Sequence, residues 1–351
     1  MKREILISGS PRETRVAILE DDRLVELLVD RPDARRTVGD IYLGRVEAVL
    51  PGIQAAFVDI GAEKSAFLHA SDLVEDEEED EPSDSDDEDE DEDEDDGSGN
   101  GSAGGRGRSR RRVPNIADEL KRGEAKLVQV IKEPISTKGP RVTAQVSLAG
   151  RFLVFMPFAS KVGVSRKIEG RDQRARLREM VSRLVPKADG GWIIRTVADD
   201  LTEDKCKREI DHLLGTWKKI RSKAGSARAP ALLQRETSLT RGIVRDLFSD
   251  KVDSLLVDSP QLHSEIQQYL RQIDPELLDR VKLYRDETSL FDQYDIEAEI
   301  RGLFQQRVEL PTGGYVIIQP TEALTSIDVN TGRYTGKRDP ESTILRTNTE
   351  A

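Results

Sequence analysis

The amino-acid sequence predicts an α+β protein built from several domains, and three observations lead to this fold class. The 351 residues are enough for two or three domains with sizeable cores. Short apolar runs separated by turn residues fill much of the first half of the chain, as expected for antiparallel strands. Longer stretches with apolar residues at helical spacing follow, and a hairpin pattern returns near the end of the sequence.

The first predicted element is a three-stranded meander over residues 4–30. Its runs read EILIS, TRVAILED and RLVELLVD, and turn residues at positions 9–11 and 21–22 separate them. These strands are too short to bury a face of their own, so we expect them to pair with a later segment. Asp22 and Asp30 are interpreted as turn or surface residues, not as a carboxylate site.

The second predicted element is a small barrel that begins at residue 38. Five short, evenly spaced strand runs with Gly-rich turns predict a barrel of the OB class. Phe57 and Phe67 fall on two of these runs, where they either form a base-stacking platform or fill the barrel core. The residues alone leave both roles open. The five runs read DIYLGRVEAVL, IQAAFVDIG, SAFLH, KLVQVIKE and RVTAQVSL.

A low-complexity insert interrupts the barrel over about residues 74–113. Residues 75–96 hold 19 acids and no base, and residues 106–112 hold five arginines. This composition cannot bury enough apolar surface to offset chain entropy, so it predicts a disordered loop. The loop is either a solubilising surface segment or a polyanion that competes for the basic surface of the barrel.

Residues 145–235 combine strands with two helices. The spacing of apolar residues predicts helices over residues 173–184 and 203–224, and a strand in GWIIRT. Arg195 and Thr196 end that strand, where a guanidinium fork and a hydroxyl suit a terminal phosphate. The alternative is that both are ordinary surface residues. One face of the second helix is interpreted as core packing: Ile210, Leu213, Leu214, Trp217 and Ile220.

Residues 239–303 predict a further mixture of helices and a strand. Helices are expected at residues 239–250, 261–273 and 276–284, and they flank the strand VDSLLVDS. From residue 304 the pattern changes to a hairpin, in which RVEL, a turn at 311–314 and YVIIQP lead into a last strand.

That last strand, LTSIDV, carries the candidate metal site. Side chains alternate across a strand, so Asp328 and Asn330 share one face while Val329 points into the core. A carboxylate beside an amide suits Mg²⁺, which takes one or two carboxylates and completes its shell with water and phosphate. The alternative interpretation is a pair of turn residues.

The composition excludes several classes of protein. The single cysteine, Cys206, excludes a disulfide framework and a cysteine-built zinc site within this chain. The three histidines lie far apart, which argues against a hydrolase built on a histidine pair. No apolar run reaches the ~18 residues of a membrane helix, and the first residues lack a secretory signal core. We therefore expect a cytoplasmic protein.

The net charge of −13 hides a nearly neutral body. Without the acidic and arginine runs of the insert, the 67 acids fall to 48 and the 54 bases fall to 49. Any surface that binds nucleic acid must therefore come from local clusters of cations, because phosphate affinity depends on the cations near the strand.

Three sequence blocks occur together in a fixed order. They are AAFVDIGAEKSAFLHASDL in the barrel, IIRT at residues 193–196 and TEALTSIDVNTG around Asp328. With these blocks the chain resembles the ribonuclease E/G family over nearly its whole length, apart from the acidic insert. The motifs HASD and GKRD resemble the ribonuclease G branch more than the ribonuclease E branch.

The resemblance implies four subdomains. They are an RNase H-like subdomain, an S1-like OB-fold domain that binds RNA, a 5′-sensor subdomain and the start of a DNase I-like catalytic subdomain. In this order they correspond to residues 1–37 with 241–303, 38–144, 145–240 and 304–351.

The resemblance also implies the residues of two binding sites. One is an RNA-binding face formed by Phe57, Phe67 and Lys138. The other is a pocket for the 5′-monophosphate of RNA, in which Arg195 and Thr196 contact the phosphate. Its remaining lining positions are Gly150, Val154 and Arg166.

For the catalytic centre the resemblance implies Asp328 as a ligand of Mg²⁺, with Asn330 orienting that carboxylate or the phosphate. The family continues with a second metal-binding aspartate and a cysteine-based zinc link between subunits. Neither lies within these 351 residues, so we expect a fragment with weak or no cleavage. Zinc and the homo-oligomer are expected only with the missing part.

The resulting hypothesis is an Mg²⁺-dependent endoribonuclease that acts on single-stranded RNA, such as rRNA precursors and mRNA, and favours 5′-monophosphorylated ends and A/U-rich sites. Two alternatives remain open. A non-catalytic RNA-binding adaptor is favoured if Asp328 is a buried turn residue. A scaffold whose acidic insert recruits basic partners is favoured if RNA binding is absent. We expect no DNA partner and no membrane segment.

Overall fold

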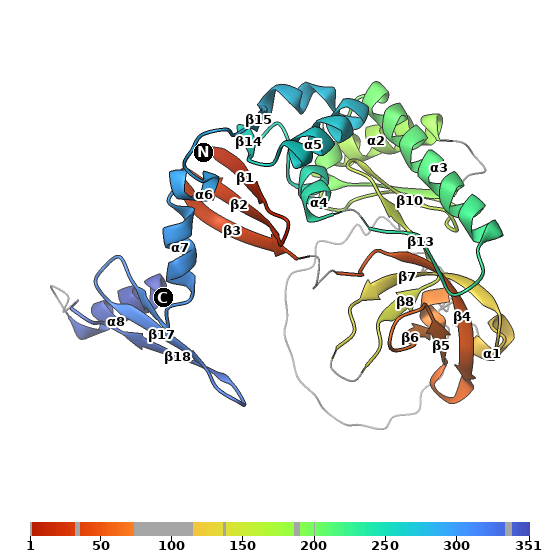
Figure 1. Cartoon of the computed structure of the whole chain (residues 1–351), viewed down its shortest axis with the longest axis horizontal. Helices are drawn as coiled ribbons and strands as arrows, with labels where there is room; N and C mark the ends of the chain where they lie inside the picture. The colour runs from red at the N-terminus through yellow and green to blue at the C-terminus, as the bar shows by residue number, and fades with distance from the viewer. Residues whose placement is uncertain are drawn as a thin grey trace, which may run out of the picture. The chain divides into compact units, whose positions relative to one another are not determined.

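The computed structural model describes two compact units, which Figure 1 shows as ribbons. Unit 1 comprises Met1–Ala34 and Leu239–Ala351, and unit 2 comprises Arg35–Ser238. The predicted insert at 74–113 lies outside the described residues. No helix within the described parts is long and apolar enough to cross a membrane. The described residues are 2–31, 36–73, 115–135, 138–185, 190–199, 201–236, 238–333 and 339–351.

Unit 1 contains a five-stranded sheet in the order β15-β14-β1-β2-β3. The predicted meander is confirmed, because β1, β2 and β3 pair antiparallel in sequence order. β1 also pairs in parallel with β14, where Ile5 lies opposite Leu255, so a later segment completes the sheet. The strands are β1 (Arg3–Gly9), β2 (Thr14–Glu20), β3 (Arg23–Asp30), β14 (Ser254–Val257) and β15 (Val281–Leu283).

The expected helix at residues 276–284 is wrong. A 3-10 turn spans Pro275–Arg280, and β15 follows with Val281 opposite Leu255. The physical reason is the alternation of Val281 and Leu283 around Lys282, which suits a strand that buries Val281. A helix this short also gains little stability by itself. The two earlier predicted helices are present as α4 (Leu239–Asp246) and α5 (Pro260–Ile273).

Both faces of the unit 1 sheet are covered by apolar side chains. Ile5 and Ile7 belong to the core cluster that includes residues of α4 and α5. Leu6, between them, belongs to the cluster formed with α6 (Leu290–Gln293) and α7 (Ile296–Leu303). The continuous apolar run EILIS therefore reflects a strand that is buried on both faces.

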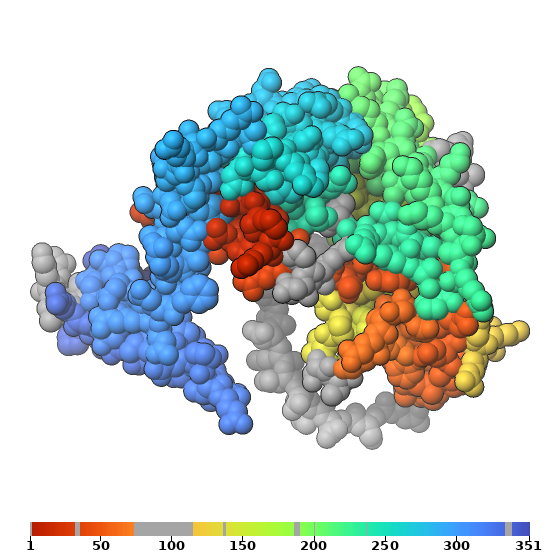
Figure 2. All heavy atoms as spheres, viewed as in Figure 1, coloured from red at the N-terminus to blue at the C-terminus, as the bar shows by residue number. Residues whose placement is uncertain are grey.

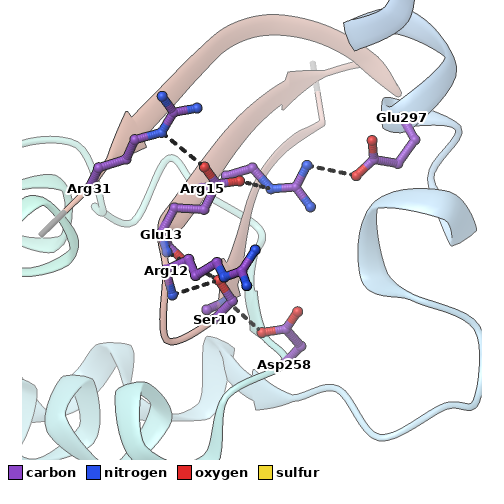
Figure 3. Close-up of polar contacts among 8 residues, drawn as sticks. Ser10, Arg12, Glu13, Arg15, Arg31, Asp258 and Glu297 are labelled. Atoms are coloured by element: carbon purple, nitrogen blue, oxygen red, sulfur yellow. Dashed lines mark hydrogen bonds and ion pairs between the residues drawn. The ribbon is translucent and has the colours of Figure 1, made fainter. Parts of the chain in front are cut away.

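A chain of ion pairs links the meander to α7, as Figure 3 shows. Arg15 on β2 donates to Glu297 on α7 at 2.7 Å, and its guanidinium lies 4.8 Å from the centroid of the Phe291 ring. Glu13 accepts from Arg31 at 3.1 Å and lies 3.6 Å from Arg15. These contacts tie the end of the sheet to the helix that leads into the last segment.

The last segment forms a three-stranded antiparallel sheet followed by a helix. The predicted hairpin is confirmed, with Val308 opposite Val316, and Val316 opposite Val329. The expectation that Val329 points into the core is wrong, because this side chain is not buried. Val329 lies opposite Val316 on the same face of the sheet but remains 37% exposed. The elements are β16 (Arg307–Glu309), β17 (Tyr315–Pro320), β18 (Thr325–Asn330) and α8 (Pro340–Glu350).

Unit 2 contains the predicted five-stranded barrel. Its strands follow the order β4-β5-β6-β8-β7, and pairing of β4 with β7 closes the ring. The interior is filled by alternate side chains of these strands, among them Val58, Leu68 and Val142. A short helix, α1 (Ile116–Glu119), packs beside β4. The strands are β4 (Ile41–Leu50), β5 (Ala55–Asp59), β6 (Ala66–His69), β7 (Ala125–Lys132) and β8 (Arg141–Thr143).

The rest of unit 2 is a four-stranded sheet with two helices. The predicted helices are confirmed as α2 (Arg171–Leu184) and α3 (Glu203–Ser226), and α3 runs along the outer surface of this unit in green in Figure 2. Ile210, Leu213 and Ile220 of the predicted stripe are buried, while its other two members are half-buried. The strands are β9 (Leu148–Ala149), β10 (Leu153–Met156), β11 (Val162–Val164) and β12 (Gly191–Ile194), and β13 (Ala231–Gln234) joins β4.

Candidate RNA-binding, phosphate-binding and nuclease sites

Two phenylalanine rings lie on the outer surface of the barrel. Phe57 on β5 lies directly opposite Phe67 on β6, with ring centroids 6.2 Å apart and an angle of 69° between the rings. Their neighbours Ala56, Val58 and Leu68 point into the core, so alternation along the strands turns both rings outward. Phe57 is 37% exposed and Phe67 is half-buried. The core-filling alternative does not describe either ring.

Two basic residues extend this row across the barrel. Arg141 on β8 lies opposite Phe67, and Lys132 on β7 lies opposite Arg141. Arg141 donates to Asp72 at 2.9 Å, so part of its charge is already balanced. Sequence reasoning missed both residues. The long insert separates β6 from β7 and β8 in the sequence, so no local pattern shows which residues of these strands lie opposite each other. The available signal was that each of two predicted barrel strands contains a basic residue.

Lys138 lies in the loop that precedes β8 and is exposed. This loop packs closely against β6. The backbone N–H of Phe67 donates to Pro140 O at 2.8 Å, and a Cβ on Gly139 would lie 2.1 Å from Ser65 O. Only glycine permits that approach, which places the Lys138 segment beside the strand that carries Phe67.

His69 is a further aromatic residue that the sequence reasoning missed. Its ring centroid lies 6.5 Å from that of Phe67, with the planes inclined by 24°. The Ser71 N–H donates to His69 Nδ1 at 3.2 Å, and the Ser71 hydroxyl lies 2.8 Å from the same nitrogen. Phe57, Phe67 and His69 thus place three rings on one surface of β5 and β6. The i, i+2 spacing of Phe67 and His69 was the signal that could have identified it.

The candidate phosphate pocket is organised around Arg195, which follows β12. Its backbone N–H donates to Phe152 O at 2.8 Å, and its Nη1 donates to Gly150 O at 2.7 Å. A guanidinium carries five N–H donors in a planar fork, so one edge can be anchored to the protein while another grips an anion. The turn that contains Gly150 therefore sets the direction of this side chain.

The other predicted pocket residues lie on the same sheet. β11 and β12 are parallel, with Val164 opposite Ile194, so Arg166 and Thr196 both follow the same edge of the sheet. Both are exposed. Val154 lies opposite Ile193, which is 39% exposed, on the face that points away from the core. The structure thus brings Gly150 and Arg195 into contact, while Val154, Arg166 and Thr196 lie on or shortly after strands of the same sheet.

Glu209 on α3 lies behind this turn and is 1% exposed. It accepts the backbone N–H groups of Arg151, Phe152 and Leu153 at 2.5, 2.8 and 2.9 Å. Burial raises the pKa of Glu209 to about 7, although the three N–H donors and the charge of Arg151 oppose that shift. The sequence reasoning missed this residue. Its position in the buried stripe of α3 was the available signal.

The candidate nuclease residues lie on one face of β18, as predicted. Asn330 Nδ2 donates to Asp328 Oδ2 at 2.9 Å, and both side chains are accessible to solvent. Asp328 lies opposite Ile317, which in turn lies opposite Arg307 on β16. The guanidinium of Arg307 stacks 3.7 Å from the centroid of the Tyr315 ring. Asp328 is therefore an exposed strand residue and not a buried turn residue.

The chemistry of this pair fits Mg²⁺ only in part. Among the residues that the structure describes, no three His, Cys, Asp or Glu side chains gather into a metal site. Asp328 would supply one hard oxygen ligand, and the amide oxygen of Asn330 would be a second candidate. Mg²⁺ keeps several waters and commonly uses one or two carboxylates with substrate phosphate, so this pair could hold the ion only with such help.

Known proteins resemble this chain over its whole length. The profile of the Ribonuclease E/G family matches residues 147–351. Ribonuclease G of Haemophilus influenzae is 38% identical over 348 residues, covering 99% of this chain and 66% of that protein. Ribonuclease G of Escherichia coli strain K12 is 36% identical over 351 residues, covering 100% of this chain and 67% of that protein.

A ribonuclease E is similar to a slightly lower degree. Ribonuclease E of Haemophilus influenzae is 35% identical over 352 residues, covering 100% of this chain and 35% of that protein. The chain thus spans about two thirds of the length of the relatives named ribonuclease G and about one third of this ribonuclease E.

Proposed function

This chain belongs to the ribonuclease E/G family, and on that premise we propose that it binds single-stranded RNA and takes part in endonucleolytic cleavage that favours 5′-monophosphorylated RNA. The observation that carries the proposal is the row formed by Phe57, Phe67, Arg141 and Lys132 on the barrel surface. Two rings can stack on bases, while the two cations contact the backbone phosphates. Every base has a π-face, so this surface tolerates many sequences.

The pocket at Arg195 would recognise the 5′ end. A terminal monophosphate carries a charge between about −1.5 and −2 and three acceptor oxygens, which a planar guanidinium can grip in bidentate fashion. The Gly150 carbonyl anchors Arg195, so the fork is held in place before RNA arrives. A 5′-hydroxyl end offers no such charge and would bind less tightly.

Asp328 and Asn330 would form part of the cleavage centre with Mg²⁺. Bound Mg²⁺ supplies Lewis-acid polarisation of a phosphate and a lowered pKa for a coordinated water. Asp328 would hold the ion, and the Asn330 amide would orient the carboxylate through the contact at 2.9 Å. Since Asp328 is the one carboxylate of this pair, we expect RNA binding by this chain to exceed cleavage. The proposed substrates are rRNA precursors and mRNA, and the proposed assembly is a homo-oligomer.

The test is a binding titration with one A/U-rich RNA prepared with either a 5′-monophosphate or a 5′-hydroxyl. A fluorophore at the 3′ end reports binding by anisotropy and leaves the 5′ end free. Tighter binding of the monophosphate, reduced by Arg195→Lys and unchanged by Arg183→Lys, supports the proposal, because lysine reproduces a bidentate contact poorly. Equal affinity for both ends would refute the 5′ pocket. Failure to bind either RNA would refute the whole proposal.

The adaptor alternative is not favoured by the geometry of Asp328. That alternative requires a buried turn residue, whereas Asp328 is exposed on β18 beside Asn330. Cleavage assays in Mg²⁺ with the binding RNAs distinguish the two functions. Cleavage that Asp328→Asn removes supports the nuclease, and binding without any cleavage in the assembled protein supports the adaptor.

A further inference from the structure

The buried carboxylate of Glu209 occupies an unusual position behind the proposed phosphate pocket. Three consecutive backbone N–H groups, from Arg151 to Leu153, converge on its two oxygens. A carboxylate can accept all three because each oxygen offers two lone pairs. The contact is also intolerant of change, since both the carboxylate and the N–H groups are away from water.

The same turn faces Arg195 on its other side. The Gly150 N–H donates to Leu153 O at 2.8 Å, which closes the turn. The Gly150 carbonyl then accepts from Arg195 Nη1 at 2.7 Å, and Phe152 O accepts the Arg195 N–H at 2.8 Å. The turn therefore connects Glu209 to the guanidinium: the carboxylate holds one side of the turn, and the carbonyls on the other side hold the arginine.

Packing at Gly150 shows how closely the carboxylate approaches the turn. A Cβ added at Gly150 would lie 2.6 Å from Glu209 Oε1 and 2.8 Å from Leu153 O. Real Cβ atoms do not occupy such positions, so the glycine lets the turn rest directly on the carboxylate. A shift of Glu209 would consequently move the Gly150 carbonyl.

We propose that Glu209 is a positioning residue for 5′-phosphate recognition, because it fixes the Gly150–Leu153 turn whose Gly150 carbonyl aims Arg195. This inference rests on the proposed function of the pocket and adds a residue that would never touch the RNA. Glu209 would therefore affect only the preference for a 5′-monophosphate over a 5′-hydroxyl end. The barrel surface that binds the rest of the RNA is formed by other strands.

The experiment compares Glu209→Gln with Glu203→Gln, a matched change at an exposed glutamate on the same helix. Glutamine preserves the volume of Glu209, but its NH2 group faces backbone N–H donors and cannot accept from them. The measured quantity is the ratio of affinities for 5′-monophosphate and 5′-hydroxyl RNA. We expect Glu209→Gln to lower this ratio roughly threefold or more and to leave the affinity for 5′-hydroxyl RNA unchanged. Glu203→Gln should change neither.

Three further measurements separate positioning from a general loss of stability. Amide hydrogen exchange at residues 151–153 should accelerate in Glu209→Gln. Adding Glu209→Gln to Arg195→Ala should lower the ratio no further, since the two residues act in series. Glu209→Asp, which keeps a carboxylate, should retain more of the ratio than Glu209→Gln, and it carries the test if the glutamine variant does not fold.

The outcomes distinguish this inference from the proposed function. A wild-type ratio of one overturns the phosphate pocket and the role of Glu209 with it. A wild-type ratio above one that Arg195→Ala removes and Glu209→Gln preserves overturns the role of Glu209 alone. A ratio that falls in both single variants and falls further in the double variant also overturns it, because Glu209 would then act independently of Arg195.

Discussion

Replacing Phe57 tests the barrel surface most directly. Phe57 is 37% exposed and forms an edge-to-face pair with Phe67, so its ring is only partly accessible to a base. Stacking on an aromatic side chain contributes about 1–3 kcal/mol per base. Because the ring is only partly accessible, we expect Phe57→Ala to cost about 1–2 kcal/mol of binding, which corresponds to roughly a 5- to 30-fold increase in Kd.

The same change should cost little folding stability. Phe57 lies outside the barrel core cluster, so its loss leaves no buried cavity of the kind that costs about 3–5 kcal/mol. The edge-to-face contact with Phe67 contributes about 0.5–1.5 kcal/mol, and this sets the expected loss. Phe57→Leu provides a second variant, because it retains apolar contact with the barrel but has no π-face. It should bind RNA almost as weakly as the alanine variant.

The assay is anisotropy with a 3′-labelled single-stranded RNA, alongside the thermal midpoint of each variant. Phe158→Ala is the matched control, since Phe158 is a more exposed ring in the other part of unit 2, at 54% exposure. It should bind RNA like the wild type. Unfolding of Phe57→Ala with normal binding by Phe57→Leu would show that the ring is structural, and the stacking argument would be refuted.

Three other predictions follow from the described residues. Lys138→Gln should make the salt dependence of RNA affinity shallower by about 0.7 in the slope of log K against log salt, and an unchanged slope would place Lys138 away from the backbone. Burial raises the pKa of Glu209 from its ordinary 4.5 to about 7, so its protonation stabilises the fold. Relative to Glu209→Gln, the wild type should lose up to roughly 3 kcal/mol of unfolding free energy between pH 4.5 and pH 7. Denaturant titrations across that range check this, and a constant difference would contradict it. Asp328→Asn should remove any Mg²⁺-dependent cleavage while leaving RNA binding intact, which gel analysis of the products can measure against an unchanged Kd.

The sequence was sufficient where structure follows from local periodicity. The barrel strands alternate with period two, and α3 carries an apolar stripe with helical spacing, so both could be identified from residue order. The prediction for the segment at Val281 was wrong because its pattern was interpreted as the end of a helix. Its strand conformation depends on pairing with Leu255, a contact that only the assembled sheet provides.

For the candidate sites, too, the sequence revealed residues that form a local pattern and missed residues whose role depends on tertiary contacts. Phe57 and Phe67 were identified because aromatic residues on predicted strands are visible in the sequence, although which face they occupied was not. Glu209 was missed because its partners are backbone N–H groups, which every residue carries and no sequence pattern marks. Arg141 was missed because its place beside Phe67 depends on strand register across the insert.

The charges on the barrel surface also bear on the source of the proposed affinity for RNA. The body of the protein is nearly neutral, and Arg141 is already paired with Asp72 at 2.9 Å. A phosphate that approaches Arg141 must compete with that carboxylate, so this cation adds less than an isolated arginine would. The rings of Phe57 and Phe67 face no such competitor, and stacking is not screened by salt as phosphate contacts are. The proposed RNA affinity should therefore depend more on the rings than on the cations, and such a surface is compatible with a net charge of −13.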